Sequence, residues 1–160
     1  MQAKTGFRIR DLIERPPSVG DLMVVCEDNY RYLLHLVPQL RGLEGQHRST
    51  SGEHQDLHLT IVEQTRYTTL VRLTYHFVHG DGHTPDPDAL LRVYHDARQV
   101  EVEDLRQQTL PTQRLYEAPG LRNKWRLNLF VSRWLMFCIR QGHLFVGDLT
   151  KLRQAVCDVT

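Results

Sequence analysis

Two runs in which apolar and polar side chains alternate lie close together near the middle of the chain, within residues 57–78 (LHLTIVEQTRYTTLVRLTYHFV). Successive side chains of a β-strand point to opposite faces of a sheet, so a two-residue period predicts strands with one buried face. A single strand over the whole stretch would be about 70 Å long at about 3.3 Å per residue, which is too long for a small domain. The chain is therefore expected to turn near residues 64–67 and to form a hairpin.

A second pair of alternating runs follows at residues 90–95 (LLRVYH) and 100–105 (VEVEDL). The residues between these runs begin with Asp96, and Asp is favoured at the first position of a type I turn. Glu101 and Glu103 alternate with valines, which is typical of a strand with one face in water. These features predict a second antiparallel hairpin beside the first.

Two longer stretches have apolar residues at spacings of three and four, the pattern of a helix with one buried face. The first covers residues 21–37, where Ser18 and Asp21 resemble a capping box at the start and a proline ends the helix. The second covers residues 123–141 and is followed by Gly142, a natural C-terminal cap.

Together these elements predict an α+β fold, in which an antiparallel four-stranded sheet of two hairpins packs on an N-terminal and a C-terminal helix. One domain is expected over residues 21–142, with an N-terminal extension (1–20) and a C-terminal tail (143–160) that could contain a short helix. The residues 42–55, rich in Gly, Ser and polar side chains, are interpreted as a mobile loop. The predicted core is centred on Leu33, Ile61, Val71, Leu73, Val93, Phe130 and Trp134.

The composition is that of a soluble single-domain protein, with 160 residues, 41% hydrophobic and 24% charged, and a formal net charge of +1. This balance gives no overall field that would attract nucleic acid or an anionic membrane. No apolar run approaches the length needed to span a bilayer. The basic residues gathered after residue 113 are interpreted as a solvated helix face, so nucleic-acid binding is the weaker alternative.

The three cysteines, Cys26, Cys138 and Cys157, lie far apart and form no CxxC pair. The start of the chain also lacks the long apolar run of a signal peptide, so we expect a cytoplasmic protein with reduced thiols. Cys26 and Cys138 fall on the apolar faces of the two expected helices. We therefore expect both to be buried hydrophobic residues rather than nucleophiles.

Four separated motifs follow one another within residues 21–142. They are CEDNYRYLLHLVP (26–38), LTIVEQTRYTTLV (59–71), VYHDARQVEV (93–102) and the helix that carries Trp134 and Cys138. In this order they resemble the YqiB-like proteins, a bacterial family whose function is unassigned. The resemblance implies a soluble bacterial cytoplasmic protein, and it brings no catalytic residue because the family offers none.

Reactive polar side chains gather at the two expected turns, where ordinary turns would use Gly, Asn or Pro. The candidate ligand-binding residues are Glu63, Arg66, Tyr67, Tyr94, His95 and Asp96. Because successive hairpins of a meander point the same way, the two turns are expected to approach each other. A guanidinium and an imidazole held together suit a small anion such as a phosphate or a carboxylate.

Two other interpretations of these residues stay open. In a structural one, Glu63 pairs with Arg66 or Arg98 to hold the turns in place. In a catalytic one, the Glu63, Arg66, His95 and Asp96 cluster belongs to a small hydrolase, with His95 as general base oriented by a carboxylate.

His76, His79, Asp81 and His83 are close enough in the sequence to supply metal ligands, but the glycines and prolines among them are typical of an exposed turn. We assign no metal to them. The chain has no familiar catalytic signature and no cofactor motif. We therefore expect a non-enzymatic binding or regulatory module for a protein partner or a small anionic ligand, with the hydrolase as the alternative.

Overall fold

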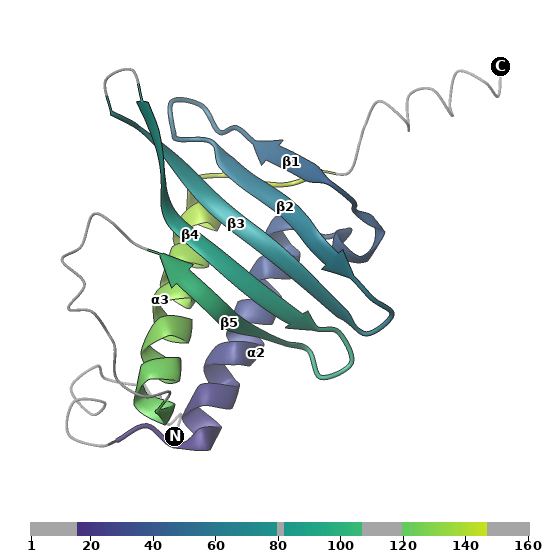
Figure 1. The fold of residues 1–160 in the computed structure, drawn as a ribbon, viewed down its shortest axis with the longest axis vertical. Coiled ribbons are helices and arrows are strands. Elements are labelled where there is room, and N and C mark those ends of the chain that lie inside the picture. Colours follow the sequence, from purple (N-terminus) through teal and green to yellow (C-terminus); the bar gives the residue numbers. More distant parts are fainter. Residues whose placement is uncertain (1–15, 80–81, 107–119, 147–160) are drawn as a thin grey trace, which may run out of the picture.

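The chain forms one antiparallel sheet with two long helices packed against one of its faces (Figure 1). This computed structural model describes residues 16–79, 82–106 and 120–146. The strands follow one another as a meander in the order β1-β2-β3-β4-β5, and the predicted α+β class is confirmed. The elements are α2 (Val19–Leu36), the 3₁₀ helix η1 (Leu40–Gly42), β1 (Gln46–Ser49), β2 (Leu57–Gln64), β3 (Thr68–His79), β4 (Gly82–Tyr94), β5 (Gln99–Arg106) and α3 (Leu121–Arg140).

The sheet has five strands, so the prediction of four strands was wrong. The additional strand is β1, which lies within the residues 42–55 interpreted as a mobile loop. Its sequence, QHRS, has no apolar alternation, and only Ser49 is buried. Pairing with β2, from Gln46 opposite Thr60 to Ser49 opposite Leu57, makes this segment a strand. That pairing is a long-range interaction that a local pattern does not encode.

Strand β4 is longer than the expected run at residues 90–95, because it begins at Gly82 and contains Pro85 and Pro87. Proline cannot donate to a ladder and is found at strand edges and bulges. Pro85 and Pro87 lie near a bulge and in a part of β4 that has no partner strand on the β5 side among the described residues. The β3–β4 register shifts between Thr74 and His76, and β5 pairs with β4 only from Asp88 onward.

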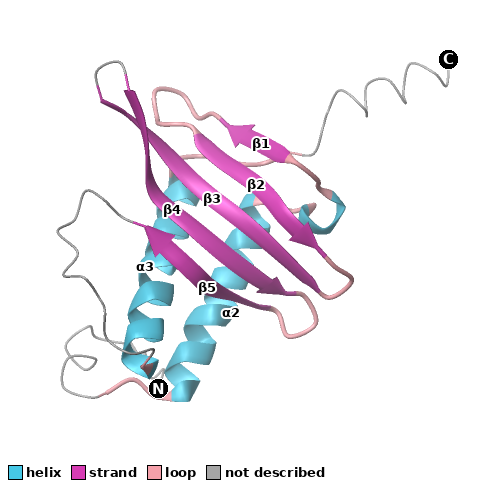
Figure 2. Cartoon of the chain, in the orientation of Figure 1, coloured by secondary structure: helices cyan, strands magenta, loops and turns pink. Residues whose placement is uncertain are grey.

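The two helices lie side by side behind the sheet (Figure 2). Their bounds are within two residues of the predicted ones. The predicted capping box at the start of α2 is present, with Asp21 N–H donating to Ser18 Oγ at 3.2 Å and Ser18 N–H donating to Asp21 Oδ2 at 2.7 Å. Among the described residues, neither helix combines the length and the apolarity that crossing a bilayer requires.

Helix α3 ends in a Schellman motif that leads the chain back to the sheet. Gly142, at φ +85°, donates its N–H to Ile139 O at 3.0 Å, and the next N–H, of His143, goes to Cys138 O at 3.1 Å. The buried His143 ring then lies between Ser49 Oγ, 3.0 Å from Nδ1, and Tyr75 Oη, 3.1 Å from Nε2. This turn joins the end of α3 to β1 and β3.

The residues after Gly142, which the sequence analysis assigns to a tail, continue along the domain. Phe145 is buried in the core, and its N–H donates to Leu36 O at 2.8 Å. The short helix considered for the end of the tail and the first fifteen residues of the N-terminal extension lie outside the described residues.

The core fills the space between the sheet and the two helices. Of the residues predicted to centre it, Ile61 and Phe130 are half-buried against the core and the other five are buried. Apolar side chains of one sheet face and of both helices meet there, as the two-residue and three-to-four-residue periods predict.

Replacing Trp134 by Ala is expected to lower the free energy of unfolding by about 3–5 kcal/mol, because it removes a large side chain that is only 6% exposed. Urea denaturation measures the loss. Phe137→Ala, on the same helix at a side chain that is 49% exposed, is the control and is expected to cost less. Equal losses for the two variants would contradict the packing of α3 described here.

Both described cysteines are expected to resist alkylation in the native protein. Burial raises the pKa of Cys26 to about 11, with Glu101 and Glu27 adding to the effect, and raises the pKa of Cys138 to about 12. The thiolate that reacts with iodoacetamide is therefore scarce at neutral pH. Cys157 lies outside the described residues, so the experiment uses Cys157→Ser and mass spectrometry. Labelling should appear only in urea, and fast labelling of the native protein would refute the burial of either thiol.

Candidate functional site

The two turns that carry the predicted site residues lie side by side at one end of the sheet. One joins β2 to β3 at residues 65–67, and the other joins β4 to β5 at residues 95–98. The N–H of His95 donates to Tyr67 O at 3.0 Å, so the turns are in direct contact. The meander topology produces this contact, because both hairpins turn at the same end of the sheet.

The predicted residues of the β2–β3 turn are exposed. The guanidinium of Arg66 lies 5.3 Å from the centroid of the Tyr67 ring, which is itself 54% exposed. Glu63 is also exposed and forms no ion pair with another described residue. The expected pairing of Glu63 with Arg66 or Arg98 is therefore not part of the described structure.

The predicted residues of the β4–β5 turn point in different directions. Val93 and His95 are buried on the helix side, and Tyr94 between them is half-buried on the opposite face. Asp96 is exposed, and its Oδ1 accepts the N–H of Ala97 at 3.0 Å. The six predicted residues are thus neighbours along the two turns, but strand alternation divides their side chains between two faces.

His95 belongs to a chain of hydrogen bonds that reaches η1. Gln64 Nε2 donates to Leu40 O at 3.0 Å and to Leu43 O at 3.3 Å, which leaves Gln64 Oε1 as the acceptor of the Thr69 hydroxyl. The oxygen of Thr69 lies 2.6 Å from His95 Nε2. Because that hydroxyl has already donated its proton, it accepts from Nε2–H. The neutral His95 ring therefore carries its proton on Nε2.

The surroundings of His95 favour its neutral form. Burial lowers the pKa of His95 below its usual value of 6.5, and the positive charge of Arg41 lowers it further. The carboxylate of Asp96 opposes both effects without reversing them. His95 is consequently a neutral hydrogen-bonding group at pH 7, and an approaching anion would favour its cationic form.

His95 also lines a cleft of about 480 Å³, called the His95 cleft below. The cleft lies between the last turns of α2, η1 and the β4–β5 turn. Its lining residues are Tyr30, Leu34, Pro38, Gln39, Leu40, Arg41, Gly42, His95 and Arg98. Two arginines and a histidine thus line one cleft, and none of its described lining residues is acidic.

The backbone of Arg98 is in an unusual conformation for its residue type. Its φ is +53°, in the left-handed region where Gly or Asn is usual, because the β-carbon of other residues meets the backbone there. Non-glycine residues held in this region are found disproportionately at functional sites. The turn thus carries a backbone cost at an arginine that lines the cleft.

Sequence reasoning missed Arg41 and named Arg98 only as a partner of Glu63. Nothing local marks Arg41, since it stands between a proline and a Gly-rich stretch and belongs to no periodic pattern. Its position near His95 depends on the bonds from Gln64 to the carbonyls of η1. The positive φ of Arg98 could not be predicted either, because arginine is not a residue type that indicates this backbone conformation.

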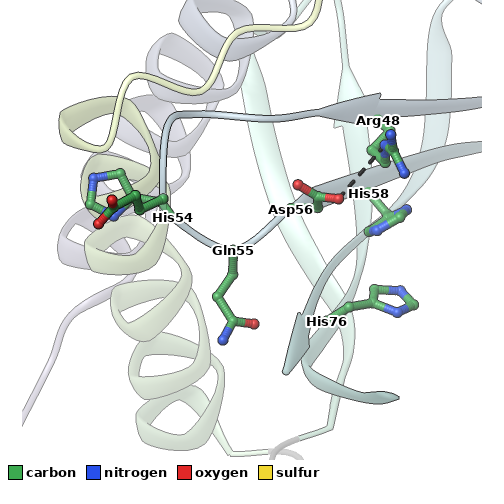
Figure 3. Close-up of a pocket in the computed structure, with 7 residues that line it drawn as sticks. Arg48, His54, Gln55, Asp56, His58 and His76 are labelled. Carbon is green, nitrogen blue, oxygen red and sulfur yellow. Dashed lines mark ion pairs between the residues drawn. The ribbon is translucent and has the colours of Figure 1, made fainter. Parts of the chain in front are cut away.

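A second hollow, of about 560 Å³, lies beside the β1–β2 loop (Figure 3). Arg48 Nε is 3.7 Å from Asp56 Oδ2, and the rings of His58 and His76 have centroids 4.0 Å apart. No group of three metal-ligating side chains occurs within the described part of the chain. Of the histidine cluster predicted from the sequence, only the His76 side chain is described.

The molecule is thus an α+β domain with a one-sided helix layer and a cationic cleft at the turn end of its sheet. The chain belongs to the family described as "Protein of unknown function (DUF1249)", whose model matches residues 32–144. It is 30% identical over 135 residues to the uncharacterized protein YqiB of Escherichia coli strain K12, covering 81% of this chain and 94% of YqiB. The YqiB proteins of the E. coli O6:H1 and O157:H7 strains match equally well. No solved structure matches the chain significantly.

These comparisons confirm the resemblance to YqiB-like proteins. The names of the family and of these relatives assign no activity.

The stability of the protein is expected to fall as the pH drops below 6.5. Burial is the first cause of a lowered pKa at both His95 and His143, so the unfolded chain binds more protons than the folded one below 6.5. The contribution of these neutral rings to the free energy of unfolding is complete above pH 6.5. It is lost as the pH falls toward the lowered pKa values of the folded state. Urea denaturation between about pH 5 and pH 8 measures this dependence.

His95→Gln is the matched variant, because a glutamine amide keeps a donor for Thr69 but does not titrate. Its free energy of unfolding should depend less on pH than that of the parent protein over the same range. An unchanged pH dependence would show that His95 does not titrate differently in the two states.

Proposed function

We propose that this protein is a non-enzymatic binding module whose His95 cleft holds a small anionic ligand, such as a phosphate or a carboxylate. The observation that carries the proposal is the charge of the lining: Arg41, Arg98 and His95 share a cleft, and none of its lining residues in the described part of the chain is acidic. Guanidinium groups bind oxyanions through paired, charge-assisted hydrogen bonds. The free, buried cysteines suit a reducing compartment, so we place this binding in the cytoplasm.

The backbone of Arg98 supports the same interpretation. An L-residue in the left-handed region costs about 1–2 kcal/mol, and glycine would avoid most of this cost. An arginine at this position is explained if its side chain binds the ligand in the cleft. The geometry thus favours binding by Arg98 over a role in stabilising the turn.

The contacts of the candidate catalytic groups lack the pairing of a carboxylate with His95 that the hydrolase alternative invokes. The Nε2 of His95 is engaged with the hydroxyl of Thr69, and the carboxylate of Asp96 accepts the N–H of its own turn. A histidine that acts as a general base needs a free nitrogen facing the reacting proton and a group that orients its ring. Thr69 orients the ring through Nε2, and neither Asp96 nor Glu63 is hydrogen-bonded to the ring within the described part of the chain, so a base oriented by a carboxylate is not formed there.

Pyrophosphate is the test probe, titrated at constant ionic strength against a sodium chloride control. A ligand that binds only the folded state at about a hundred times its dissociation constant stabilises the protein by about 2.7 kcal/mol. We expect pyrophosphate to raise the melting temperature of the parent protein and not that of Arg41→Gln or Arg98→Gly. Isothermal titration calorimetry gives the affinity.

Arg66→Gln is the matched control, because it removes the same charge from the neighbouring turn but not from the lining of the cleft. It should keep the response to pyrophosphate. If Arg66→Gln abolishes the response and Arg41→Gln keeps it, the ligand lies at the exposed turn, as the sequence-based hypothesis has it. No response of the parent protein to pyrophosphate, phosphate or citrate would refute anion binding.

Arg98→Gly separates function from structure. If Arg98 serves the cleft, this variant should be at least as stable as the parent protein, because glycine relieves the left-handed backbone, and should bind pyrophosphate more weakly. A clear loss of stability with unchanged binding would show that Arg98 stabilises the turn instead.

A further inference from the structure

Helix α3 carries a row of arginines along the side that faces away from the core. Arg126, Arg133 and Arg140 are spaced seven residues apart, Arg122 lies about one turn before them, and all four are exposed. The buried side chains of α3 lie on the opposite side of the helix and are Asn128, Val131, Trp134, Leu135 and Cys138. Residues seven apart differ by only about 20° around an α-helix. The row therefore follows the helix for about 21 Å from Arg126 to Arg140, at about 1.5 Å per residue.

Apolar side chains lie between the arginines of this row. Leu129 and Met136 are also seven residues apart, and both are partly exposed. The partly buried side chains of α3 that pack against the core are at other positions, Phe130 and Ile139.

Arginine and apolar side chains thus alternate along the row at spacings of three and four, as at the a and d positions of a seven-residue repeat. This row is called the Arg133 seam below, and it consists of Arg122, Arg126, Leu129, Arg133, Met136 and Arg140.

The charges of the Arg133 seam are not compensated within the described structure. None of its arginines forms an ion pair with another described residue. Helix α3 contains no Asp or Glu, and its remaining cation, Lys124, lies on another side of the helix with its Nζ 3.5 Å from Glu101 Oε1. Like charges one turn apart destabilise a helix, as do cations near its N-terminus. A face selected only for solvation would gain from mixed charges, whereas this one attracts an anionic partner.

The seven-residue repeat favours a helix over the other anionic partners. Helices that pack side by side insert apolar side chains at this spacing between those of the partner. A nucleic-acid backbone would use the arginines and leave Leu129 and Met136 without a role. The main apolar face of α3 is already in the core, so the helix has no such face to insert into a membrane surface. A second copy of the seam would bring arginines opposite arginines, which disfavours self-association there.

We propose that the Arg133 seam is a docking surface for a partner protein that presents an acidic amphipathic helix. Carboxylates of the partner helix pair with Arg126, Arg133 and Arg140, and its apolar side chains pack on Leu129 and Met136. The described lining of the His95 cleft includes no residue of α3, so this surface is separate from the proposed anion site.

The probe is a labelled synthetic peptide of about three heptads, with Glu at a, Leu at d, and Ala and Gln elsewhere. Fluorescence anisotropy measures its binding to the full chain at constant ionic strength. The matched peptide has Gln in place of each Glu. It should bind at least about tenfold more weakly, because it loses the charge-assisted bonds to the arginines.

Arg133→Glu, in the middle of the seam, should weaken binding of the Glu peptide at least about tenfold, because an attraction becomes a repulsion. Arg66→Glu is the matched control, since it makes the same charge reversal at an exposed arginine of the β2–β3 turn. It should bind the peptide as the parent protein does. Met136→Gln should also weaken binding, because it removes an apolar contact without changing the charge. Circular dichroism checks that each variant is folded.

Labelled oligouridylate and vesicles that contain phosphatidylglycerol are the competing probes. The proposal fails if the Glu peptide does not bind the parent protein at millimolar concentration. It also fails if the Glu and Gln peptides bind equally, or if folded Arg133→Glu binds the Glu peptide as Arg66→Glu does. Tighter binding of oligouridylate or vesicles than of the Glu peptide, lost in Arg133→Glu and kept in Met136→Gln, would assign the seam to nucleic acid or to a membrane instead.

Discussion

The side-chain amide of Asn128 holds together the three parts on which the rest of the structure depends. In α3, its Nδ2 donates to Lys124 O at 2.8 Å, and its Oδ1 accepts the N–H of Val102 in β5 at 3.0 Å. The Nδ2 of Asn29, in α2, donates to Asn128 Oδ1 at 3.4 Å and to the backbone Asn128 O at 3.3 Å. Apolar packing alone would allow the helices to slide over the sheet, whereas buried directional bonds favour one position. This position brings Trp134, further along α3, against β3.

The opposite end of the sheet depends on a different set of bonds. The amide of Gln64 binds two carbonyls of η1, and through Thr69 it is connected to His95. These contacts hold the segment after α2 against the end of the sheet, where Arg41 faces the β4–β5 turn. The cationic cleft is therefore a consequence of how the link between α2 and β1 packs, and not of the turns alone.

Two hollows of the molecule differ in chemistry because they form at different contacts between the layers. The His95 cleft lies where polar turns meet a 3₁₀ helix, and cationic side chains gather in it. A hollow of about 320 Å³ lies between aromatic residues of the core and the loop before β2, so aromatic side chains dominate its lining. The family match covers residues 32–144, which include most of the lining of the first and all of the lining of the second.

Local patterns in the sequence determined that β2, β3, β5 and the two long helices form, and which of their faces are buried. The alternation in β2 and β3 and the capping box at Ser18 were sufficient for this, because strand and helix periods act over a few residues. Only the tertiary structure decided that the polar segment of β1 is a strand, that Arg41 shares a cleft with His95, and that the indole N–H of Trp134 is buried without a hydrogen-bond partner among the described residues. Each of these three features depends on contacts between residues that are far apart in the chain. Such contacts are determined by how the layers pack and not by local spacing.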